Sequence, residues 1–266
     1  HPLSFCSCNN LAKPLMIQMR KGDLIQSLSL FGFKYARILT RRMTREEAEG
    51  LKKKYHYVHI YSFEKENLPG YDVKIQRTPI FDLSEDLGGI FRKFNDTCKK
   101  HIRRGERNAD LILAVPDNNV DASHALYKRI KNQEGARPDI KREFKNNLFS
   151  NAYVNGEMIV TMSFYDNGEV IRAKHIASLR KKMGEDAKIV AHASRRLNWE
   201  VIKWGKANGR KIFDLGGVTD DWEKAGIREF KKSFGGTEVD MHIYRYTTPV
   251  FAFLKKILNM FGKNIN

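Results

Sequence analysis

Hydrophobic and polar positions alternate along several segments of this chain with the two-residue period of half-buried strands. The clearest example is 151–178, a β-hairpin whose alternating segments flank the turn dipeptide Asn167-Gly168, with an earlier tight turn at Asn155-Gly156. The other segments that we expect to be extended are 33–40, 55–63, 73–84, 109–115, 210–217 and 237–247. From residue 109 onward, this pattern predicts a sheet with an antiparallel centre.

The intervening segments repeat their apolar residues with the period of a helix. Thr44 and Glu47 have the spacing of a capping box and begin the first of these helices. We expect 84–108 to form one strongly basic helix, capped by Ser84, with an apolar stripe of Ile90, Phe94, Cys98 and Ile102. The remaining predicted helices are 121–131, 191–209, 225–234 and an amphipathic tail in 249–266. The mixed order of strands and helices predicts an α/β (α+β) fold.

Composition narrows the class of protein. The chain has 266 residues, 41% of them hydrophobic, which is enough for one large core or two small ones. No apolar run approaches the ~20 residues of a membrane-spanning helix. Lys and Arg number 48 against 31 Asp and Glu, which gives a net charge of +17. Such an excess favours anionic partners, namely nucleic acid, phosphorylated small molecules or an acidic membrane face.

The cysteines and histidines suggest no cofactor. There are three cysteines, an odd number that does not support a disulfide framework, and we interpret them as reduced thiols of a cytoplasmic protein. The first ten residues lack the charged flank and apolar run of a secretory signal. The eight histidines show no H-x-x-x-H pair and no partner serine motif, so we expect neither a metal enzyme nor a hydrolase triad.

Three segments carry a resemblance to a known family. They are KKHIRRGERNADLIL (99–113), SRRLNWEVIKWGKANGRKIFDLGG (194–217), which ends in D-x-G-G, and AGIREFKKSFGG (225–236), which is similar to G-[IL]-x-x-F-K-x-x-F-G. Together they resemble the Fem family of non-ribosomal peptidyltransferases, which build peptidoglycan cross-bridges. A looser group of Fem-like acyltransferases in surface-polysaccharide pathways shares the pattern. The resemblance implies a GNAT-like fold, with a mixed, largely antiparallel sheet flanked by helices.

The resemblance also implies how the chain is divided. Family members have two GNAT-like units, and residues 1–83 are too short for a full first unit, so we expect a reduced N-terminal unit there. Residues 84–248 then form the GNAT-like acyltransferase domain. The C-terminal helix of 249–266 either packs on that domain or makes a peripheral contact with the inner membrane face through its apolar side and its lysines.

The donor is the next expectation. The stretch SLRKKMGEDAK (178–188) stands where a GNAT protein cradles the pyrophosphate of acetyl-CoA. It has one residue too many between Arg180 and Gly184, and the carboxylates of Glu185 and Asp186 would repel a pyrophosphate. This argues against a standard CoA site. The family resemblance implies an aminoacyl-tRNA donor, and the +17 charge agrees with binding to an RNA backbone.

The catalytic candidates lie in the second half of the chain. Lys231, which follows Phe230 in the F-K motif, is implied by the resemblance to stabilise the oxyanion of the reacting carbonyl; the other interpretation is a solvated helix lysine. Asp214 either accepts a proton from the attacking ammonium, positions the acceptor or caps backbone N–H groups. Gly216 and Gly217 either allow close approach of a ligand or make a sharp turn.

Basic residues supply the remaining candidates for substrate binding. Arg103, Arg104 and Arg107 either bind phosphates of the acceptor or of tRNA, or form a solvated helix face. Arg180 is the candidate from the loop after the hairpin, and Phe230 of the F-K motif is a further candidate for substrate binding.

Three functions remain open at this point. The first is transfer of an aminoacyl group from aminoacyl-tRNA to an amine of an anionic peptidoglycan or cell-wall precursor. The second is an acyl-CoA-dependent N-acyltransferase that acts on an amino sugar, carried by a nucleotide, in surface-polysaccharide synthesis. The third is a non-catalytic RNA- or membrane-binding module on a degenerate GNAT scaffold. In both enzymatic hypotheses the donor, aminoacyl-tRNA or acyl-CoA, is a co-substrate, and we expect no cofactor.

Overall fold

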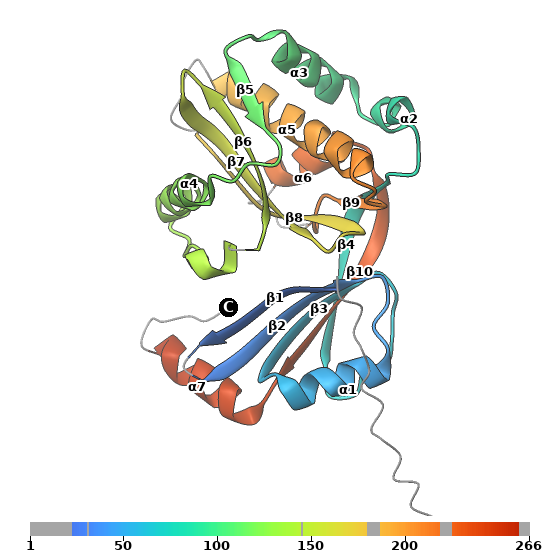
Figure 1. The fold of residues 1–266 in the computed structure, drawn as a ribbon, viewed down its shortest axis with the longest axis vertical. Coiled ribbons are helices and arrows are strands. Elements are labelled where there is room, and N and C mark those ends of the chain that lie inside the picture. The colour runs from blue at the N-terminus through green and yellow to red at the C-terminus, as the bar shows by residue number, and fades with distance from the viewer. Residues whose placement is uncertain (1–22, 31, 145, 180–186, 219–224, 261–266) are drawn as a thin grey trace, which may run out of the picture.

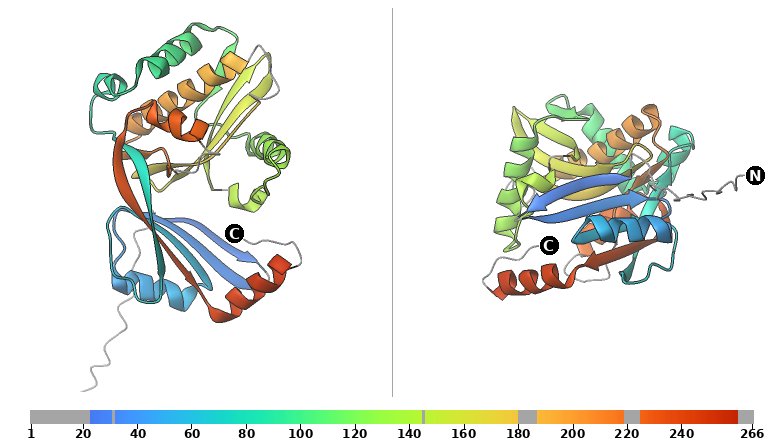
Figure 2. Two further views of the ribbon diagram at one scale, coloured as in Figure 1. Left: turned by 180° about the vertical axis from the view of Figure 1, so that it is seen from behind. Right: turned by 60° about the horizontal axis from the view of Figure 1, so that its bottom comes forward.

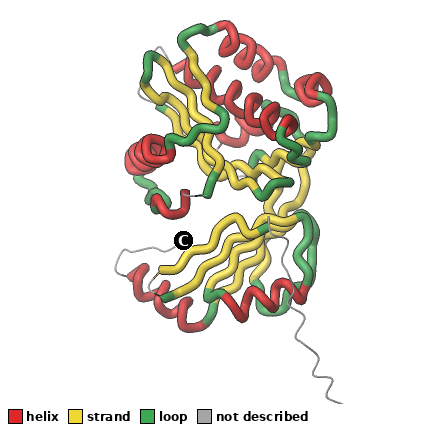
Figure 3. Tube along the Cα trace, viewed as in Figure 1, coloured by secondary structure: helices red, strands yellow, loops and turns green. Residues whose placement is uncertain are grey.

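The strands of the protein join into one mixed sheet. The computed structural model describes residues 23–260, except for 31, 145, 180–186 and 219–224. Within these ranges a 10-stranded sheet has the order β1-β2-β3-β10-β4-β9-β8-β7-β6-β5. Only the pairs β2–β3 and β8–β9 are parallel, and the other described neighbours are antiparallel. The predicted fold class, a largely antiparallel mixed sheet flanked by helices, is confirmed (Figures 1 and 3).

One half of the sheet is built mainly from the first part of the chain. Its elements are β1 (Leu24–Leu30), β2 (Phe33–Thr40), α1 (Arg45–Lys54), β3 (Tyr57–Ser62) and β4 (Asp72–Asp82). The predicted capping box at the start of α1 is confirmed, because Thr44 and Glu47 each accept a hydrogen bond from the other's backbone N–H.

The other half follows in the chain and carries most of the helices. Its elements are α2 (Leu87–Arg92), α3 (Asp96–Arg107), β5 (Leu111–Ala114), α4 (Val120–Gln133), the 3-10 helix η1 (Lys141–Phe144), β6 (Leu148–Val154), β7 (Glu157–Asp166), β8 (Val170–Ser178), α5 (Ala187–Ala207), β9 (Ile212–Asp214) and α6 (Ala225–Lys232). Helices α3 and α5 pack together over one face of β6 and β7, and their apolar residues form the largest core cluster. Helix α4 covers the opposite face through Tyr127.

Two long strands connect the halves. β10 (Thr237–Thr247) pairs with β3 over His242–Thr247 and with β4 over Thr237–Arg245. Figure 2 shows β4 and β10 running side by side from one half of the molecule into the other. The segments expected to form the N-terminal unit and the acyltransferase domain are therefore joined by one continuous sheet, and the last strand completes the sheet that the first strands begin.

The C-terminal helix lies along the first half of the sheet. α7 (Pro249–Met260) packs through Phe251, whose ring lies 5.3 Å from that of Phe33 and 6.0 Å from that of Tyr57. Val250 and Phe253 on the same helix are 63% and 66% exposed. No helix in the described ranges has the length and apolar character needed to span a membrane.

The prediction that 84–108 forms a single basic helix is wrong. The segment forms two helices, because Asp86 caps α2 by accepting from the Gly89 N–H at 2.8 Å and Asn95 caps α3 by accepting from the Cys98 N–H at 2.8 Å. The cap at Asn95 lies within 84–108 and interrupts the single helix that the spacing of the apolar residues suggested. The predicted apolar stripe is nevertheless buried in full, at Ile90, Phe94, Cys98 and Ile102.

Candidate active site

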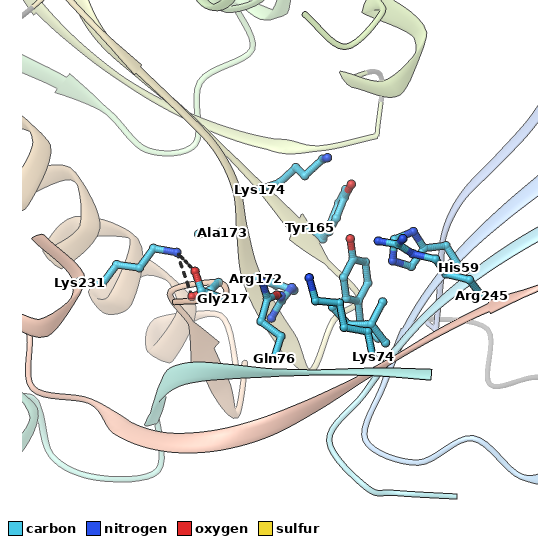
Figure 4. A pocket seen from close by; sticks show the side chains of 13 residues that line it. His59, Lys74, Gln76, Tyr165, Arg172, Ala173, Lys174, Gly217, Lys231 and Arg245 are labelled. Atoms are coloured by element: carbon cyan, nitrogen blue, oxygen red, sulfur yellow. Dashed lines mark hydrogen bonds between the residues drawn. The ribbon is translucent and has the colours of Figure 1, made fainter. Parts of the chain in front are cut away.

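A cavity of about 310 Å³ opens where strands β8 and β9 separate. These strands pair in parallel only from Val170–Arg172 to Ile212–Asp214. Beyond that point β8 continues, whereas the chain after β9 turns away at Gly216 and Gly217. Figure 4 shows the side chains that reach this space from both halves of the molecule. The lining residues are His59, Tyr61, Lys74, Gln76, Tyr165, Arg172, Ala173, Lys174, Gly216, Gly217, Lys231, Ile243 and Arg245.

The lining of the cavity is cationic. It includes Lys74, Arg172, Lys174, Lys231 and Arg245, and no described residue of the lining is an aspartate or glutamate. Concave sites lined by charges of one sign raise the local concentration of ligands of the opposite sign. The cavity therefore suits a ligand that carries negative charge or develops it during a reaction.

Lys231 is buried at one wall of this cavity. Its side chain is only 9% exposed, and Nζ donates hydrogen bonds to the carbonyl oxygens of Gly216 at 2.9 Å and Gly217 at 2.7 Å. An ammonium group has three N–H donors, and the described residues supply acceptors for two of them. Burial lowers the pKa of Lys231 to about 8, against the opposing effect of Asp214. The side chain is therefore still mostly a cation at neutral pH, with one donor available to a ligand.

Lys231 is held in place by the aromatic residues of its own motif. Phe234 is fully buried, with its ring 5.2 Å from that of Phe94, and Phe230 packs at 5.3 Å against Phe234. Gly235 has a φ of +62°, and a Cβ there would lie 2.2 Å from the Lys93 carbonyl oxygen. The F-K-x-x-F-G pattern thus has a physical basis, because the two phenylalanines and the glycine fix α6 while the lysine points into the cavity. Phe230 itself does not line the cavity.

The D-x-G-G turn is built around a buried carboxylate. Asp214 is fully buried and accepts hydrogen bonds from the Thr78 hydroxyl, the Arg172 guanidinium and the Gly216 N–H, the last at 2.7 Å. It is absent from the lining of the cavity. This geometry favours a positioning role, in which Asp214 fixes the turn and the arginine, over proton transfer with a substrate.

The two glycines of the turn lie against different neighbours. Gly216 has a φ of +75°, and an added Cβ would lie 2.9 Å from the Ala173 carbonyl oxygen. At Gly217 an added Cβ would overlap the Gln76 side chain, at 1.8 Å from its Cδ. Their absent side chains let the turn approach β8 and β4 closely and aim both carbonyl groups at Lys231.

Two stacked rings, those of Tyr61 and His59, also line the cavity. The Arg172 guanidinium lies 4.7 Å from the centre of the Tyr61 ring, which stacks on His59 at 4.6 Å. Burial, followed by the charge of Arg37 and other nearby cations, holds the pKa of His59 well below its ordinary value. His59 is therefore a neutral imidazole at pH 7.

Sequence reasoning missed most of these lining residues, although six of them share a signal. They occur as polar or aromatic residues two positions apart within strands, so both members of each pair point to one face. The pairs are His59 with Tyr61, Lys74 with Gln76, and Arg172 with Lys174. Charged residues at alternate positions inside an otherwise apolar strand could have indicated this site.

The predicted arginines lie elsewhere. Arg103, Arg104 and Arg107 are exposed on α3 and do not line the cavity. Arg180 lies outside the described residues. The structure therefore brings together Lys231, Gly216 and Gly217 at the cavity, and leaves the α3 arginines on a separate surface.

The structure also forms a serine–histidine–aspartate row that the sequence did not suggest. Ser163 pairs with His175 across β7 and β8, with 2.7 Å between Oγ and Nδ1, and His175 Nε2 lies 2.8 Å from Asp139 Oδ2. Ser163 is 2% exposed and does not line the cavity, so it is not accessible as a nucleophile. The row instead fastens the segment before η1 to the sheet. The described residues contain no cluster of three or more side chains suited to holding a metal ion.

Comparison with known proteins supports the fold. No model of a known protein family and no curated protein matches the chain. FemX is similar in structure, with 10% sequence identity over 86% of this chain and 85% of FemX and a TM-score of 0.57. The C-terminal domain of a protein assigned as a lysylphosphatidylglycerol synthetase from Agrobacterium fabrum has 10% identity over 84% of this chain and 82% of that domain, with a TM-score of 0.52.

A third similar structure is L-PGS from Bacillus licheniformis. It has 14% identity over 87% of this chain and 83% of L-PGS, with a TM-score of 0.50. At such low identities the likeness describes the fold and not the reaction. The chain therefore shares the fold of FemX, of L-PGS and of the Agrobacterium fabrum domain, in agreement with the GNAT-like fold that the Fem resemblance implies.

Proposed function

We propose that the protein is an acyltransferase that moves an aminoacyl group from aminoacyl-tRNA to an amine on an anionic cell-wall precursor. The observation that carries the proposal is the buried ammonium of Lys231, held by two glycine carbonyl groups at the wall of a cationic cavity. The F-K-x-x-F-G resemblance and the fold shared with FemX support the same assignment.

The reaction requires little covalent help from the protein. The acceptor amine attacks the ester carbonyl carbon, a C–N bond forms, and the carbonyl oxygen becomes an oxyanion. The C–O bond to the ribose then breaks, the ribose oxygen leaves as a hydroxyl after taking up a proton, and the amine loses one. Lys231 offers its third N–H to the oxyanion, where a preorganised cation in a water-poor site contributes most.

The acceptor class follows from the other cations. Lys74 and Arg245 come from β4 and β10, on the side of the cavity formed by the first half of the sheet. An acceptor that carries phosphate or carboxylate groups would place them against these side chains and bring its amine toward Lys231. A peptidoglycan or nucleotide-linked precursor has such groups.

A donor screen tests this proposal. Wild-type protein is mixed with an anionic amine acceptor and with either labelled aminoacyl-tRNAs or labelled acyl-CoAs. The label that appears in the amide product is then measured. We expect transfer from aminoacyl-tRNA, a fall of about 10²-fold or more for Lys231→Met, and little change for Lys232→Met, whose side chain is exposed beside it. Transfer from acyl-CoA alone would contradict the tRNA assignment. Activity of Lys231→Met equal to wild type would contradict the role of the lysine.

A further inference from the structure

Helix α3 presents a basic surface away from the cavity. Lys99, Lys100, Arg103, Arg104 and Arg107, which we call the α3 basic surface, recur within an arc of about 140° around the helix. All but the half-buried Lys99 are exposed. Figure 1 places α3 on the outer side of α5, at the far end of the molecule from β1–β3.

Cations dominate this surface, although α3 also carries the exposed carboxylates of Asp96 and Glu106. Within the described ranges, none of the five cations of this surface makes an ion pair with a carboxylate. Cations on neighbouring surfaces do, since Lys93 lies 2.6 Å from Glu85 and Lys131 lies 2.7 Å from Glu134. An excess of positive charge on one helix face is unfavourable in the free protein, and a bound polyanion would relieve it.

Two histidines border this surface, and its cations lower the pKa of both. The rings of His101 on α3 and His192 on α5 lie 4.9 Å apart. Burial, followed by Arg195, His192, Arg104 and Lys100, lowers the pKa of His101 to about 4. Burial, Arg104 and Arg195 also lower the pKa of His192. Apart from burial, the main causes of both shifts are nearby cations and, for His101, the other imidazole.

Helix α3 packs closely against α5 beneath these cations. α3 and α5 approach closely at Gly105, where a Cβ would lie 3.2 Å from Arg196 Cδ. Arg196 Nη1 donates to the Gly105 carbonyl oxygen at 2.7 Å. The backbone of α3 is thus clamped to α5 behind the cations.

We propose that the α3 basic surface binds the sugar–phosphate backbone of RNA, here the body of the donor tRNA, while the cavity receives only the acylated end. The inference rests on the proposed tRNA donor. RNA fits better than a lipid surface, because the exposed positions of α3 carry no large apolar side chain to insert into a bilayer. Successive cations along one helix face match the repeated charges of a phosphate backbone.

The experiment measures binding of unacylated tRNA by fluorescence anisotropy at several salt concentrations. The test variant is Arg103→Gln with Arg107→Gln, and the control is Lys128→Gln with Arg129→Gln, two exposed cations on α4. Loss of two phosphate contacts should weaken binding at least tenfold and reduce the slope of log K against log salt by about 1.5. The control should keep the wild-type slope. Equal affinities and slopes for the two variants would overturn the inference.

A short donor separates this inference from the proposed function. Aminoacyl-adenosine has the reacting ester but no tRNA body. We expect the α3 variant to transfer from it at the wild-type rate and to lose transfer only from intact tRNA, whereas Lys231→Met binds tRNA normally and transfers from neither donor. If wild type transfers from tRNA while the α3 variant does so equally well, the surface is wrong and the proposed function stands. If no donor ester is used but the α3 variant still loses tRNA affinity, the surface stands and the proposed function fails.

Discussion

The Nζ atom of Lys231 lies 2.9 Å from the carbonyl oxygen of Gly216, fifteen positions earlier in the chain, and donates a hydrogen bond to it. This contact joins α6 to the turn after β9, so two of the three segments that carry the family resemblance, 194–217 and 225–236, meet at one site. The turn supplies acceptors that orient the ammonium, and the ammonium satisfies carbonyl groups that would otherwise face a cationic cavity. The proposed catalytic role of Lys231 depends on this arrangement.

The protonation of Lys231 predicts an alkaline limit to activity. Because burial lowers its pKa to about 8, the side chain is a cation below that pH and neutral above it. We expect kcat/KM to rise with pH as the acceptor amine loses its proton, and to fall above pH ~8 as the lysine does. The pH–rate profile of the residual activity of Lys231→Met should lack the alkaline fall. An alkaline fall of equal size in that variant would assign it to another group.

The geometry of the glycine turn predicts a cost for a single methyl group. Gly216→Ala adds a Cβ that would lie 2.9 Å from the Ala173 carbonyl oxygen, at a φ of +75°. The matched control is Gly209→Ala, whose φ is +74° but whose Cβ would meet nothing within 4 Å. We expect urea unfolding to show a loss about 1–2 kcal/mol larger for Gly216→Ala, together with reduced transfer. Equal losses for both variants would mean that the turn relaxes without affecting β8.

Asp214 is predicted to act through structure and not through proton transfer. Asp214→Asn leaves the buried Arg172 guanidinium without its counter-charge, which should lower the free energy of unfolding by about 3 kcal/mol. Asp240→Asn, at an exposed position of β10, should change it little. A variant Asp214→Asn that keeps full stability but loses kcat would instead identify the carboxylate as a proton acceptor.

Local pattern was sufficient to predict many elements of the fold. The Asn167-Gly168 hairpin is confirmed as β7 and β8, and the alternating segment 237–247 is confirmed as β10. β1 was not predicted, because its inward-facing Gln26 breaks the apolar alternation. Gln26 is buried, and its amide accepts a hydrogen bond from Arg37 and donates one to the Glu143 carbonyl oxygen. These partners are distant in the sequence, so no local pattern indicates them.

The candidate site was predictable only where a motif marked it. Lys231 and the two glycines stood out in the sequence, but which strands face them depends on the sheet order. β4 lies between β10 and β9 although it precedes both by more than a hundred positions, and this places Lys74 and Gln76 at the cavity. The α3 arginines matched a basic family segment, and the fold placed that segment on a different surface.

The histidine pair beside the α3 basic surface predicts that RNA binding takes up protons. Bound phosphates would favour the imidazolium forms of His101 and His192, whose pKa values are lowered in the free protein by burial and by Arg195, Arg104 and Lys100. Affinity for tRNA should therefore rise severalfold as pH falls from 7.5 to 5.5. The variant His101→Gln with His192→Gln should lose this dependence in anisotropy titrations. A pH dependence of the same size in that variant would exclude the pair as its source.

The central claim is that Lys231 promotes aminoacyl transfer from tRNA. Its most direct test is a single-turnover measurement with labelled aminoacyl-tRNA, saturating protein and an anionic amine acceptor, comparing wild type, Lys231→Met and the exposed control Lys232→Met. We expect wild type and the control to form the amide product at similar rates. For Lys231→Met we expect a single-turnover rate at least about 10²-fold below that of wild type, at unchanged tRNA affinity. Equal single-turnover rates for all three proteins, or no transfer from any aminoacyl-tRNA, would contradict the central claim.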